Sequence, residues 1–267
     1  MAPSPDGVHP QDRHPPGPPV EPSGAVGAAP PATPDAAARL FGQRLALAER
    51  YVALLADTGI SHGLVGPRER PRLWERHVLG CAVLTDAIRE GSTVIDIGSG
   101  AGLPGLVLAI RRPDLQVTLV EPLHRRVVWL EAAVETLRLT NVSVHEGRAD
   151  SRWAGPRVDV VTARAVARIG VLAGWSLPLL VAGGCLLAVK GSSAQAEVEE
   201  DAAALRSAGA VRWQVGQLGV DLIDPPATVV SVWVEDPPGS PLTRRRAGRT
   251  RAAKPGSGGS PPPRRAR

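Results

Sequence analysis

An acidic residue followed by three alternating glycines is the pattern in this sequence that most directly suggests chemistry. Asp96 precedes Gly98, Gly100 and Gly102. A short apolar run comes before the motif and a run with helical periodicity follows it, so the glycines are expected in a turn between a strand and a helix. Ligands bind at the carboxyl ends of the strands in an open α/β sheet, and glycine lets the backbone approach a ligand closely. The motif therefore predicts a ligand-binding turn.

The spacing of the glycines separates two classes of cofactor. A dinucleotide-binding turn reads G-x-G-x-x-G, and counted from Gly98 its third glycine would fall at Leu103. The other pattern, acidic-x-G-x-G-x-G, is that of S-adenosylmethionine-dependent methyltransferases, in which Asp96 could lie near the ammonium of the cofactor, directly or through water. We therefore expect S-adenosylmethionine as the cofactor, and Leu103 argues against a nicotinamide-dependent oxidoreductase.

Two further acidic residues follow predicted strands. Glu121 ends the second strand, where a carboxylate can accept hydrogen bonds from both ribose hydroxyls of a nucleoside. Asp150 follows the third strand, where class I methyltransferases place a polar residue near the adenine amino group. Glu121 could instead be a solvated strand-end carboxylate, and Asp150 could simply form an ion pair with the flanking Arg148 or Arg152.

The elements that must position these residues alternate along the chain. Amphipathic helices are expected at 36–56 and 73–89, with a Gly/Pro-rich turn at 59–71 between them. Strands are then expected at 93–97, 117–121, 142–144, 158–161, 184–190, 211–218 and 228–234, and helices from 104 onward and at 123–139, 168–180 and 194–208. This order predicts an α/β fold: a Rossmann-like class I methyltransferase with a mostly parallel sheet, an antiparallel edge and an N-terminal helical extension.

Two segments of unusual composition flank the predicted domain at 35–236. Residues 1–34 contain 11 of the 27 prolines and almost no large apolar side chains, and residues 237–267 contain nine basic and no acidic residues. Both are expected to be disordered arms. The remainder of the chain has 22 basic and 26 acidic residues, so the formal charge of +5 comes from the tail. We expect the tail to add affinity for phosphate groups.

Composition also excludes several kinds of protein. Cys81 and Cys185 are the only cysteines, and two distant cysteines form neither a zinc-binding spacing nor a disulfide framework. No metal site is expected. No stretch approaches the about 20 apolar residues of a membrane span, and the N-terminus lacks the apolar core of a secretory signal. These features predict a cytoplasmic protein without a membrane partner.

Ordered motifs across the central part of the chain resemble a known family. The glycine motif continues as Leu103-Pro104-Gly105, and it is accompanied by LVGPRE at 64–69, WERH at 74–77, RAVA at 164–167 and AVKG at 188–191. With these motifs, residues 40–234 resemble the bacterial 16S rRNA guanine-N7 methyltransferases, also called glucose-inhibited division protein B. The resemblance implies methyl transfer from S-adenosylmethionine to N7 of a guanine in 16S ribosomal RNA. The expected partner is this RNA or the small ribosomal subunit, not DNA, and we expect a monomer.

The resemblance also implies roles for individual residues around the cofactor. The backbone at Gly98 and Leu103 corresponds to cofactor contacts, and Ala149 with Asp150 corresponds to the pair that contacts adenine. Arg164 corresponds to the arginine beside the methyl-transfer pocket, so it is the candidate catalytic residue as well as a cofactor contact. The alternative for Arg164 is a structural ion pair with a carboxylate at the end of a strand.

Two other residues are implied to face the RNA. His77 and Lys190 match family positions on that side, although His77 could also be a helix residue without a role and Lys190 a solvent-exposed lysine. The chain departs from the family pattern at Gly63, where Asn is usual, and at Ala163, where Ser is usual. These departures weaken any role for the side chains at 63 and 163 and leave the glycine motif untouched.

The implied reaction constrains how the base is recognised. Guanine N7 carries a lone pair and no proton at neutral pH, so methyl transfer to it needs no general base, and alignment dominates. Arginine commonly reads guanine through O6 and N7, but a hydrogen bond to N7 would block the reaction. We therefore expect N7 to stay free on an unpaired base, while Arg164 contacts O6 or a phosphate.

Two other function classes remain open at this stage. The same fold could methylate a protein or a small molecule, because fold alone does not set the substrate. The chain could also be a non-catalytic protein that binds RNA or the ribosome and retains a vestigial cofactor site. A substrate screen separates the first alternative from RNA methylation, and a failure to bind S-adenosylmethionine would favour the second.

Overall fold

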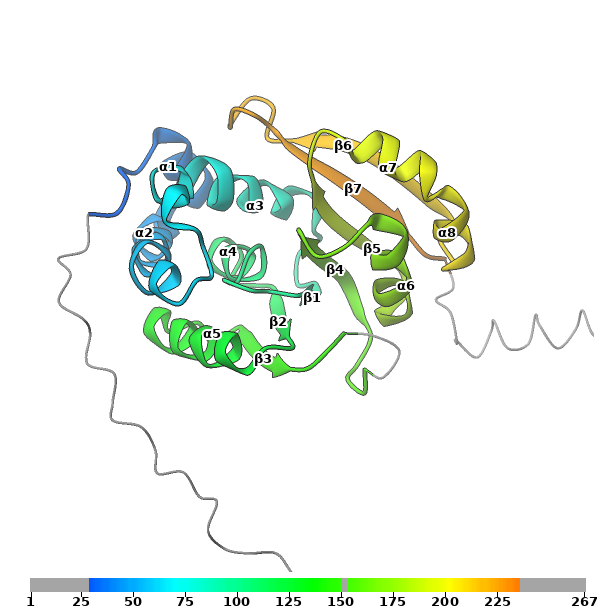
Figure 1. The fold of residues 1–267 in the computed structure, drawn as a ribbon, viewed down its shortest axis with the longest axis horizontal. Coiled ribbons are helices and arrows are strands. Elements are labelled where there is room, and N and C mark those ends of the chain that lie inside the picture. The colour runs from blue at the N-terminus through cyan, green and yellow to red at the C-terminus, as the bar shows by residue number, and fades with distance from the viewer. Residues whose placement is uncertain (1–28, 150–152, 236–267) are drawn as a thin grey trace, which may run out of the picture.

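The computed structural model describes residues 29–149 and 153–235 (Figure 1). Asp150 and the tail expected at 237–267 lie outside the described residues, and so do residues 1–28 of the expected N-terminal arm. Among the described residues, none of the helices combines the length and apolar character that crossing a membrane requires.

Seven strands form a single sheet. Their bounds are β1 Thr93–Ile97, β2 Gln116–Glu121, β3 Val142–Glu146, β4 Val158–Arg164, β5 Leu180–Lys190, β6 Arg212–Leu218 and β7 Ala227–Trp233. The order across the sheet is β3-β2-β1-β4-β5-β7-β6. The strands β1 to β5 pair in parallel, whereas β7 is antiparallel to both β5 and β6. The predicted antiparallel edge is therefore confirmed.

Helices cover both faces of this sheet. The α-helices are α1 Asp35–Phe41, α2 Leu45–Leu54, α3 Gly80–Ala82, α4 Gly105–Arg111, α5 His124–Leu137, α6 Ile169–Ser176, α7 Ala194–Glu200 and α8 Ala202–Ser207. Shorter 3₁₀ turns lie at Gly42–Arg44, Pro67–Arg72, Val83–Ala87 and Leu177–Leu179, and π-helical turns lie at Leu55–Gly59 and Leu73–Leu79. Figure 1 shows α1 to α5 on one side of the sheet and α6 to α8 on the other.

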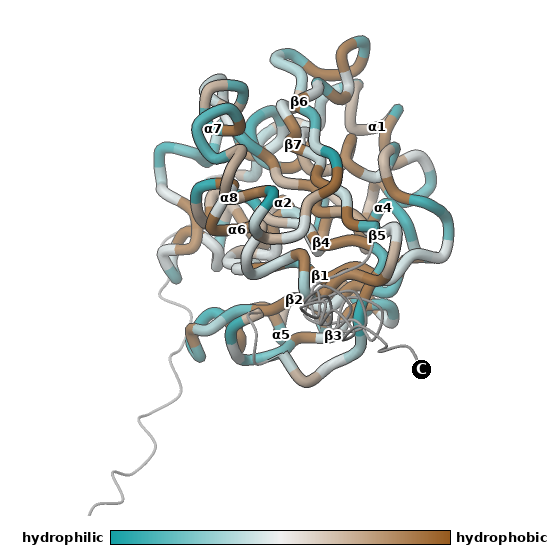
Figure 2. Tube along the Cα trace, turned by 90° about the vertical axis from the view of Figure 1, so that its right-hand side faces the viewer, coloured by the Kyte–Doolittle hydropathy of each residue, from teal (hydrophilic) through white to brown (hydrophobic). Residues whose placement is uncertain are grey.

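Successive residues of the central strands enter two different apolar cores. Val94 of β1 and Val160 of β4 belong to the core beneath α1 to α5. Their neighbours Ile95 and Val161 belong to the second core, beneath α6 to α8. Side chains alternate between the faces of a strand, so a strand that is apolar at successive positions must be covered on both sides. Figure 2 accordingly shows apolar central strands and more polar outer helices.

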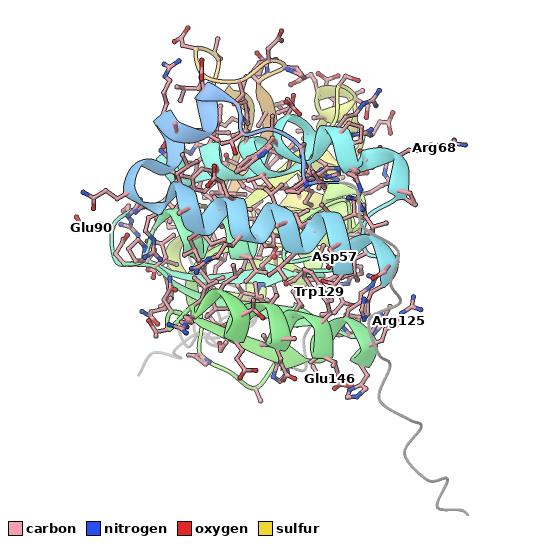
Figure 3. All side chains as sticks on the ribbon, turned by 90° about the vertical axis from the view of Figure 1, so that its left-hand side faces the viewer. Asp57, Arg68, Glu90, Arg125, Trp129 and Glu146 are labelled. Atoms are coloured by element: carbon pink, nitrogen blue, oxygen red, sulfur yellow. The ribbon has the colours of Figure 1, made fainter. Side chains whose placement is uncertain are left out.

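The N-terminal helical extension packs against α5 through α2. Trp129 of α5 is almost fully buried and donates a hydrogen bond from Nε1 to Oγ1 of Thr58 at 3.0 Å. Figure 3 shows α2 and α5 running side by side, with Trp129 in the space between them. This contact joins the extension to α5, which packs on β2 and β3.

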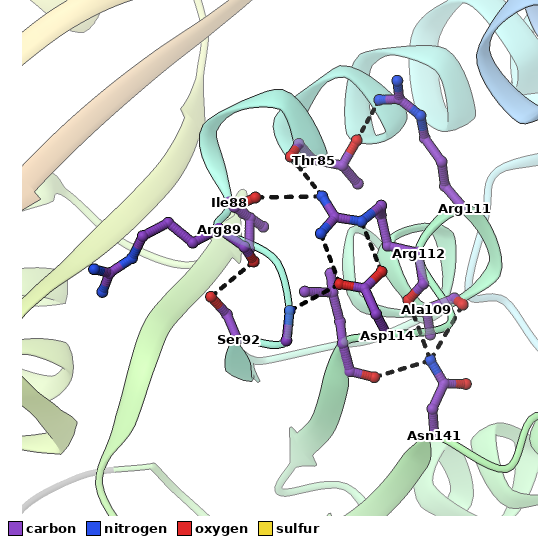
Figure 4. Close-up of polar contacts among 11 residues, drawn as sticks. Thr85, Ile88, Arg89, Ser92, Ala109, Arg111, Arg112, Asp114 and Asn141 are labelled. Atoms are coloured by element: carbon purple, nitrogen blue, oxygen red, sulfur yellow. Dashed lines mark hydrogen bonds and ion pairs between the residues drawn. The ribbon is translucent and has the colours of Figure 1, made fainter.

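A polar cluster holds the amino ends of the strands together, at the edge opposite the glycine turn. Arg112 donates to both carboxylate oxygens of Asp114 at 2.7 Å, and Asp114 also accepts the backbone N–H of Gly91 at 2.9 Å (Figure 4). The amide of Asn141 donates to the carbonyl of Leu115 at 3.0 Å.

The helix expected at 36–56 differs from the structure. It is interrupted at Gly42, which has a φ of 50° and separates α1 from the following turn and α2. A left-handed residue cannot continue a right-handed helix, and the apolar periodicity on both sides of it hides the break. The predicted range is therefore helical, but it holds two helices and not one continuous helix.

The strand expected at 184–190 begins earlier than predicted. It starts at Leu180, which pairs with Val158 before a shift in register. Gly183 lies within this irregular stretch with a φ of 77° and donates its N–H to the carbonyl of Val234. The predicted start at Gly184 thus lies inside the strand, next to a bulge.

Candidate functional site

The glycine turn lies at the carboxyl ends of β1 and β2, where the motif predicted it. Gly98, Gly100 and Gly102 all have left-handed backbone, with φ of 66°, 56° and 84°. Side-chain-bearing residues are strained in this conformation, which accounts for glycine at the three positions. The turn is tied down from both sides: the carbonyl of Val120 accepts the N–H of Gly98 at 2.8 Å, and the buried hydroxyl of Tyr51 donates to the carbonyl of Ala101 at 2.7 Å.

Asp96 lies beneath this turn and is fully buried. Its Oδ2 accepts the N–H of Gly105 at the start of α4 at 3.0 Å, and its Oδ1 accepts the hydroxyl of Thr162 at 3.2 Å. Burial raises the pKa of this carboxyl to about 7, against the lowering effect of these hydrogen bonds. Asp96 therefore joins β1, β4 and α4.

Glu121, at the end of β2, is also buried and supports the glycine turn directly. Its Oε2 accepts the N–H of Gly100 at 2.9 Å, and its Oε1 accepts the N–H of Leu123 at 3.1 Å. The guanidinium of Arg126 lies 3.7 Å from Oε2. A carboxylate has about four acceptor positions, so these backbone contacts leave capacity for hydroxyl donors. The sequence suggested the ribose role and did not reveal the structural one.

The adenine end of the expected cofactor site is described in part. Ala149 follows β3 and is buried, with 4% of its surface exposed. It belongs to the second apolar core, together with Val120 of β2. Asp150, its expected partner, lies outside the described residues. Leu103 is also nearly buried at the start of the turn into α4.

Arg164 ends β4 and is held by the N-terminal helical extension. Its Nη2 donates to the carbonyl of Arg76 at 3.1 Å and to Nδ1 of His77 at 2.7 Å. Its Nη1 donates to the carbonyl of His77 at 3.2 Å and lies 3.6 Å from the sulfur of Cys81. These contacts hold the guanidinium in place. The ion pair with a strand-end carboxylate, which was the alternative expected from the sequence, is not what holds it.

The two residues expected to face RNA direct their polar groups into the protein. His77 has 13% of its side chain exposed, and its Nε2 is 2.9 Å from a carboxylate oxygen of Glu69. Lys190 donates from Nζ to Glu197 and to the carbonyl of Ala167, both at 2.7 Å. Contact of either residue with RNA stays a prediction.

The turn that follows Arg164 lies directly over the glycine turn. A Cβ built on Gly98 would approach Cγ2 of Val166 at 3.0 Å. Ala165, between Arg164 and Val166, has a φ of 54°, a conformation that costs an alanine about 1–2 kcal/mol. Strain of this kind persists where the surroundings over-determine the backbone, and it is concentrated at functional sites.

An open cleft of about 1410 Å³ adjoins Arg164. Its walls come from the Leu73–Leu79 helical turn and α3, the turn after β4, the end of β5 with α7, and the β6–β7 pair. Its polar lining includes Arg72, Arg76, Arg164, Lys190, Gln195 and Gln217. Sequence reasoning identified Arg164 and Lys190. It missed Arg72, Arg76 and the two glutamines, since no local motif marks residues that meet only through the fold.

The architecture and the site together define a class of protein. A parallel sheet with this strand order, closed by an antiparallel β7, presents a carboxylate-supported glycine turn at its carboxyl edge. This is a class I S-adenosylmethionine-dependent methyltransferase, as the sequence predicted. Among solved structures, a SAM-dependent methyltransferase from Aquifex aeolicus matches with a TM-score of 0.48 and 21% identity, over 62% of this chain and 95% of that one.

Sequence comparison then identifies the family. The model described as GidB, rRNA small subunit methyltransferase G, matches residues 44–221. Ribosomal RNA small subunit methyltransferase G of Thermobifida fusca is 56% identical over 200 residues, which cover 75% of this chain and 84% of the relative. The protein of that name from Streptomyces avermitilis is 50% identical over 227 residues, covering 85% and 94%. The chain belongs to the rRNA small subunit methyltransferase G family, which confirms the predicted resemblance.

Proposed function

We propose that this chain transfers the methyl group of S-adenosylmethionine to N7 of a guanine in 16S ribosomal RNA. Its family membership supports the reaction and the substrate. The observation that carries the proposal is the placement of Arg164: its hydrogen bonds to Arg76 and His77 of the N-terminal helical extension hold the guanidinium beside an open cleft, and the turn that follows it packs on the glycine motif. The enzyme acts as a cytoplasmic monomer on this RNA or on the small ribosomal subunit, and not on DNA.

The residues of the carboxyl edge fit the cofactor in chemistry. When bound, S-adenosylmethionine supplies an electrophilic methyl group on a sulfonium. In the proposed arrangement the backbone of the glycine turn, including Gly98 and Leu103, contacts the methionine part, and Glu121 accepts from the ribose hydroxyls with its remaining acceptor positions. Ala149 and Asp150 contact the adenine. Asp96, beneath the glycine turn, attracts the ammonium of the cofactor electrostatically.

The protein's task in this reaction is alignment. Methyl transfer to the lone pair of N7 would release no proton, so the site needs no general base. Correct orientation of two bound reactants can lower the barrier by about 7–11 kcal/mol. Arg164 orients the base from O6 or from a neighbouring phosphate and leaves N7 free. In this proposal Lys190, which lines the cleft, faces the RNA, and His77 lies on the same side behind Arg164.

The substrate is tested by offering the purified chain tritiated S-adenosylmethionine with several acceptors. We expect label in 16S RNA or in small subunits, and background levels in transfer RNA, DNA and added protein. Label in protein or a small molecule alone would replace the proposal with the first alternative. Cofactor binding without transfer to any acceptor, or no cofactor binding, would favour the non-catalytic one.

The raised pKa of Asp96 leads to opposite pH dependences for folding and for cofactor binding. The folded-state pKa of about 7 lies above the ordinary 3.8, so the folded protein holds a proton that the unfolded chain lacks between these values. The free energy of unfolding should therefore fall as pH rises toward 7, and this contribution of Asp96 is lost above it. Because a carboxylate attracts an ammonium more strongly than the neutral acid does, cofactor affinity should rise about tenfold between about pH 6 and pH 8.

Thermal unfolding and titration calorimetry measure both slopes. In the Asp96→Asn variant both should flatten, and this separates Asp96 from the titration of the cofactor's own amine. The Asp114→Asn variant is the matched control, because its pair with Arg112 holds the pKa of Asp114 at about 2, far below the range tested. Unchanged slopes in the Asp96→Asn variant would remove Asp96 from the cofactor site.

A further inference from the structure

A line of three side chains connects the Pro67–Arg72 turn to Arg164. Oε2 of Glu69 lies 2.9 Å from Nε2 of His77, and Nδ1 of His77 lies 2.7 Å from Nη2 of Arg164. The other oxygen of Glu69 accepts Nη1 of Arg76 at 3.0 Å. The carbonyl of Arg76 in turn accepts Nη2 of Arg164. Glu69 thus contacts both His77 and Arg76, the two residues that accept hydrogen bonds from Nη2 of Arg164.

We propose that Glu69 is a positioning residue for methyl transfer: it holds His77 in the neutral Nε2–H tautomer, so that Nδ1 accepts from Arg164 and aims the guanidinium at the RNA substrate. The inference rests on the function proposed above for Arg164. It gives His77 the role of an internal acceptor, beyond the RNA contact that the sequence suggested.

The hydrogen-bonding chemistry allows one protonation state. A guanidinium only donates, so Nδ1 must present its lone pair to Arg164. A carboxylate only accepts, so Nε2 must carry the proton that it donates to Glu69. A second proton on His77 would replace the acceptor facing Arg164 with an N–H and would place an imidazolium beside a guanidinium. Protonation of His77 therefore releases Arg164.

The charges around His77 favour the neutral ring. Burial lowers the pKa of His77, and the neighbouring Arg164 and Arg76 lower it further, whereas Glu69 acts in the opposite direction. The thiol of Cys81 on α3, which lies 3.6 Å from Nη1 of Arg164, is neutral because burial raises its pKa. The hydrogen bond from His77 lowers the pKa of Glu69, so the carboxylate stays ionised as the ring's acceptor.

Two variants of Glu69 separate positioning from simple structural support. Glu69→Gln keeps an oxygen that accepts Nε2–H and removes the charge, whereas Glu69→Leu removes the acceptor. We expect Glu69→Leu to lower kcat for 16S RNA methylation about 10- to 100-fold, the scale of a misaligned reactant, with the dissociation constant for S-adenosylmethionine within about threefold of the wild type. Glu69→Gln should recover most of the kcat plateau.

The pH dependence of kcat separates positioning from a loss of stability, because a loss of stability alone would not shift its acid limb. In the wild type, kcat should fall on the acid side as His77 gains a proton. Glu69→Gln should move this limb to lower pH, because the carboxylate that stabilises the imidazolium is gone. Asp114→Asn breaks an ion pair at the remote edge of the sheet, and its profile should keep the wild-type limb. A kcat for Glu69→Leu within about twofold of the wild type, or an unmoved limb in Glu69→Gln, would overturn the proposal.

The tautomer is measured without any assay of activity. Nitrogen-15 NMR of the full chain, with the signals of His77 assigned through the His77→Asn variant, should show a protonated Nε2 and an unprotonated Nδ1 at neutral pH. The opposite tautomer, or a charged ring, would overturn the inference even in an active enzyme. The predicted tautomer in a chain that methylates no RNA would sink the proposed function and leave the Glu69–His77–Arg164 geometry standing.

Discussion

Replacing Arg164 by alanine should lower the rate of methyl transfer to 16S RNA by about 100-fold or more, while the dissociation constant for S-adenosylmethionine changes far less. The reason is that two backbone carbonyls, the imidazole of His77 and the thiol of Cys81 hold the guanidinium beside the cleft. In the proposed function this guanidinium orients the base. Single-turnover kinetics and titration calorimetry measure the two quantities.

Two further variants define what the Arg164 result means. Arg164→Lys keeps the charge without the planar fork of donors, so it should restore little of the rate. Arg112→Ala is the matched control, because Arg112 is also partly buried and donates to the backbone carbonyls of Thr85 and Ile88, but at the opposite edge of the sheet. It should cost stability without a selective loss of kcat. Equal losses of transfer and cofactor binding in Arg164→Ala would assign Arg164 to the cofactor site alone.

Gly98→Ala should weaken S-adenosylmethionine binding by at least about tenfold, a loss of about 1.4 kcal/mol. The added Cβ would lie 3.0 Å from Val166, so the turn after Arg164 or the glycine turn must shift. The backbone that the cofactor approaches and the strand end that carries Arg164 would then both lose their fit. Calorimetry with the cofactor, combined with methylation kinetics, measures the two consequences.

Gly91 offers a closely matched control for this substitution. Its φ of 68° is almost that of Gly98 at 66°, and a Cβ there would meet nothing within 4 Å. Both alanine variants therefore share the left-handed backbone penalty of about 1–2 kcal/mol, and only Gly98→Ala adds the contact over the site. Similar cofactor affinities in the two variants would contradict the assignment of Gly98 to the binding turn.

The parts of the fold that sequence predicted well are those encoded by short-range patterns. The strand at 93–97 has the predicted bounds, because a brief apolar run ends in a turn that only glycines can make. The antiparallel edge followed from two successive strand patterns without a helix between them. The site motif is also encoded locally. Asp96 and Gly105, which are joined by a hydrogen bond, are nine positions apart, on either side of the glycine turn.

The parts that sequence missed depend on contacts between distant positions. His77 and Arg164 are 87 positions apart, and nothing in either local pattern shows that one supports the other. Glu121, at the end of β2, supports the glycine turn by accepting a hydrogen bond from Gly100, and a local motif cannot reveal this contact. The early start of β5 depends on its pairing with Val158. In each case the tertiary partner, and not the local propensity, decides the outcome.

The central claim is that this chain places a methyl group on N7 of a guanine in 16S RNA. Borohydride–aniline treatment cleaves RNA at N7-methylguanine, so it reports the modified atom and its position together. After incubation of unmodified small-subunit RNA with the enzyme and S-adenosylmethionine, we expect cleavage at one guanine, absent without the cofactor and strongly reduced with Arg164→Ala. Methyl label in the RNA without such cleavage would show that another atom is modified and would contradict the account.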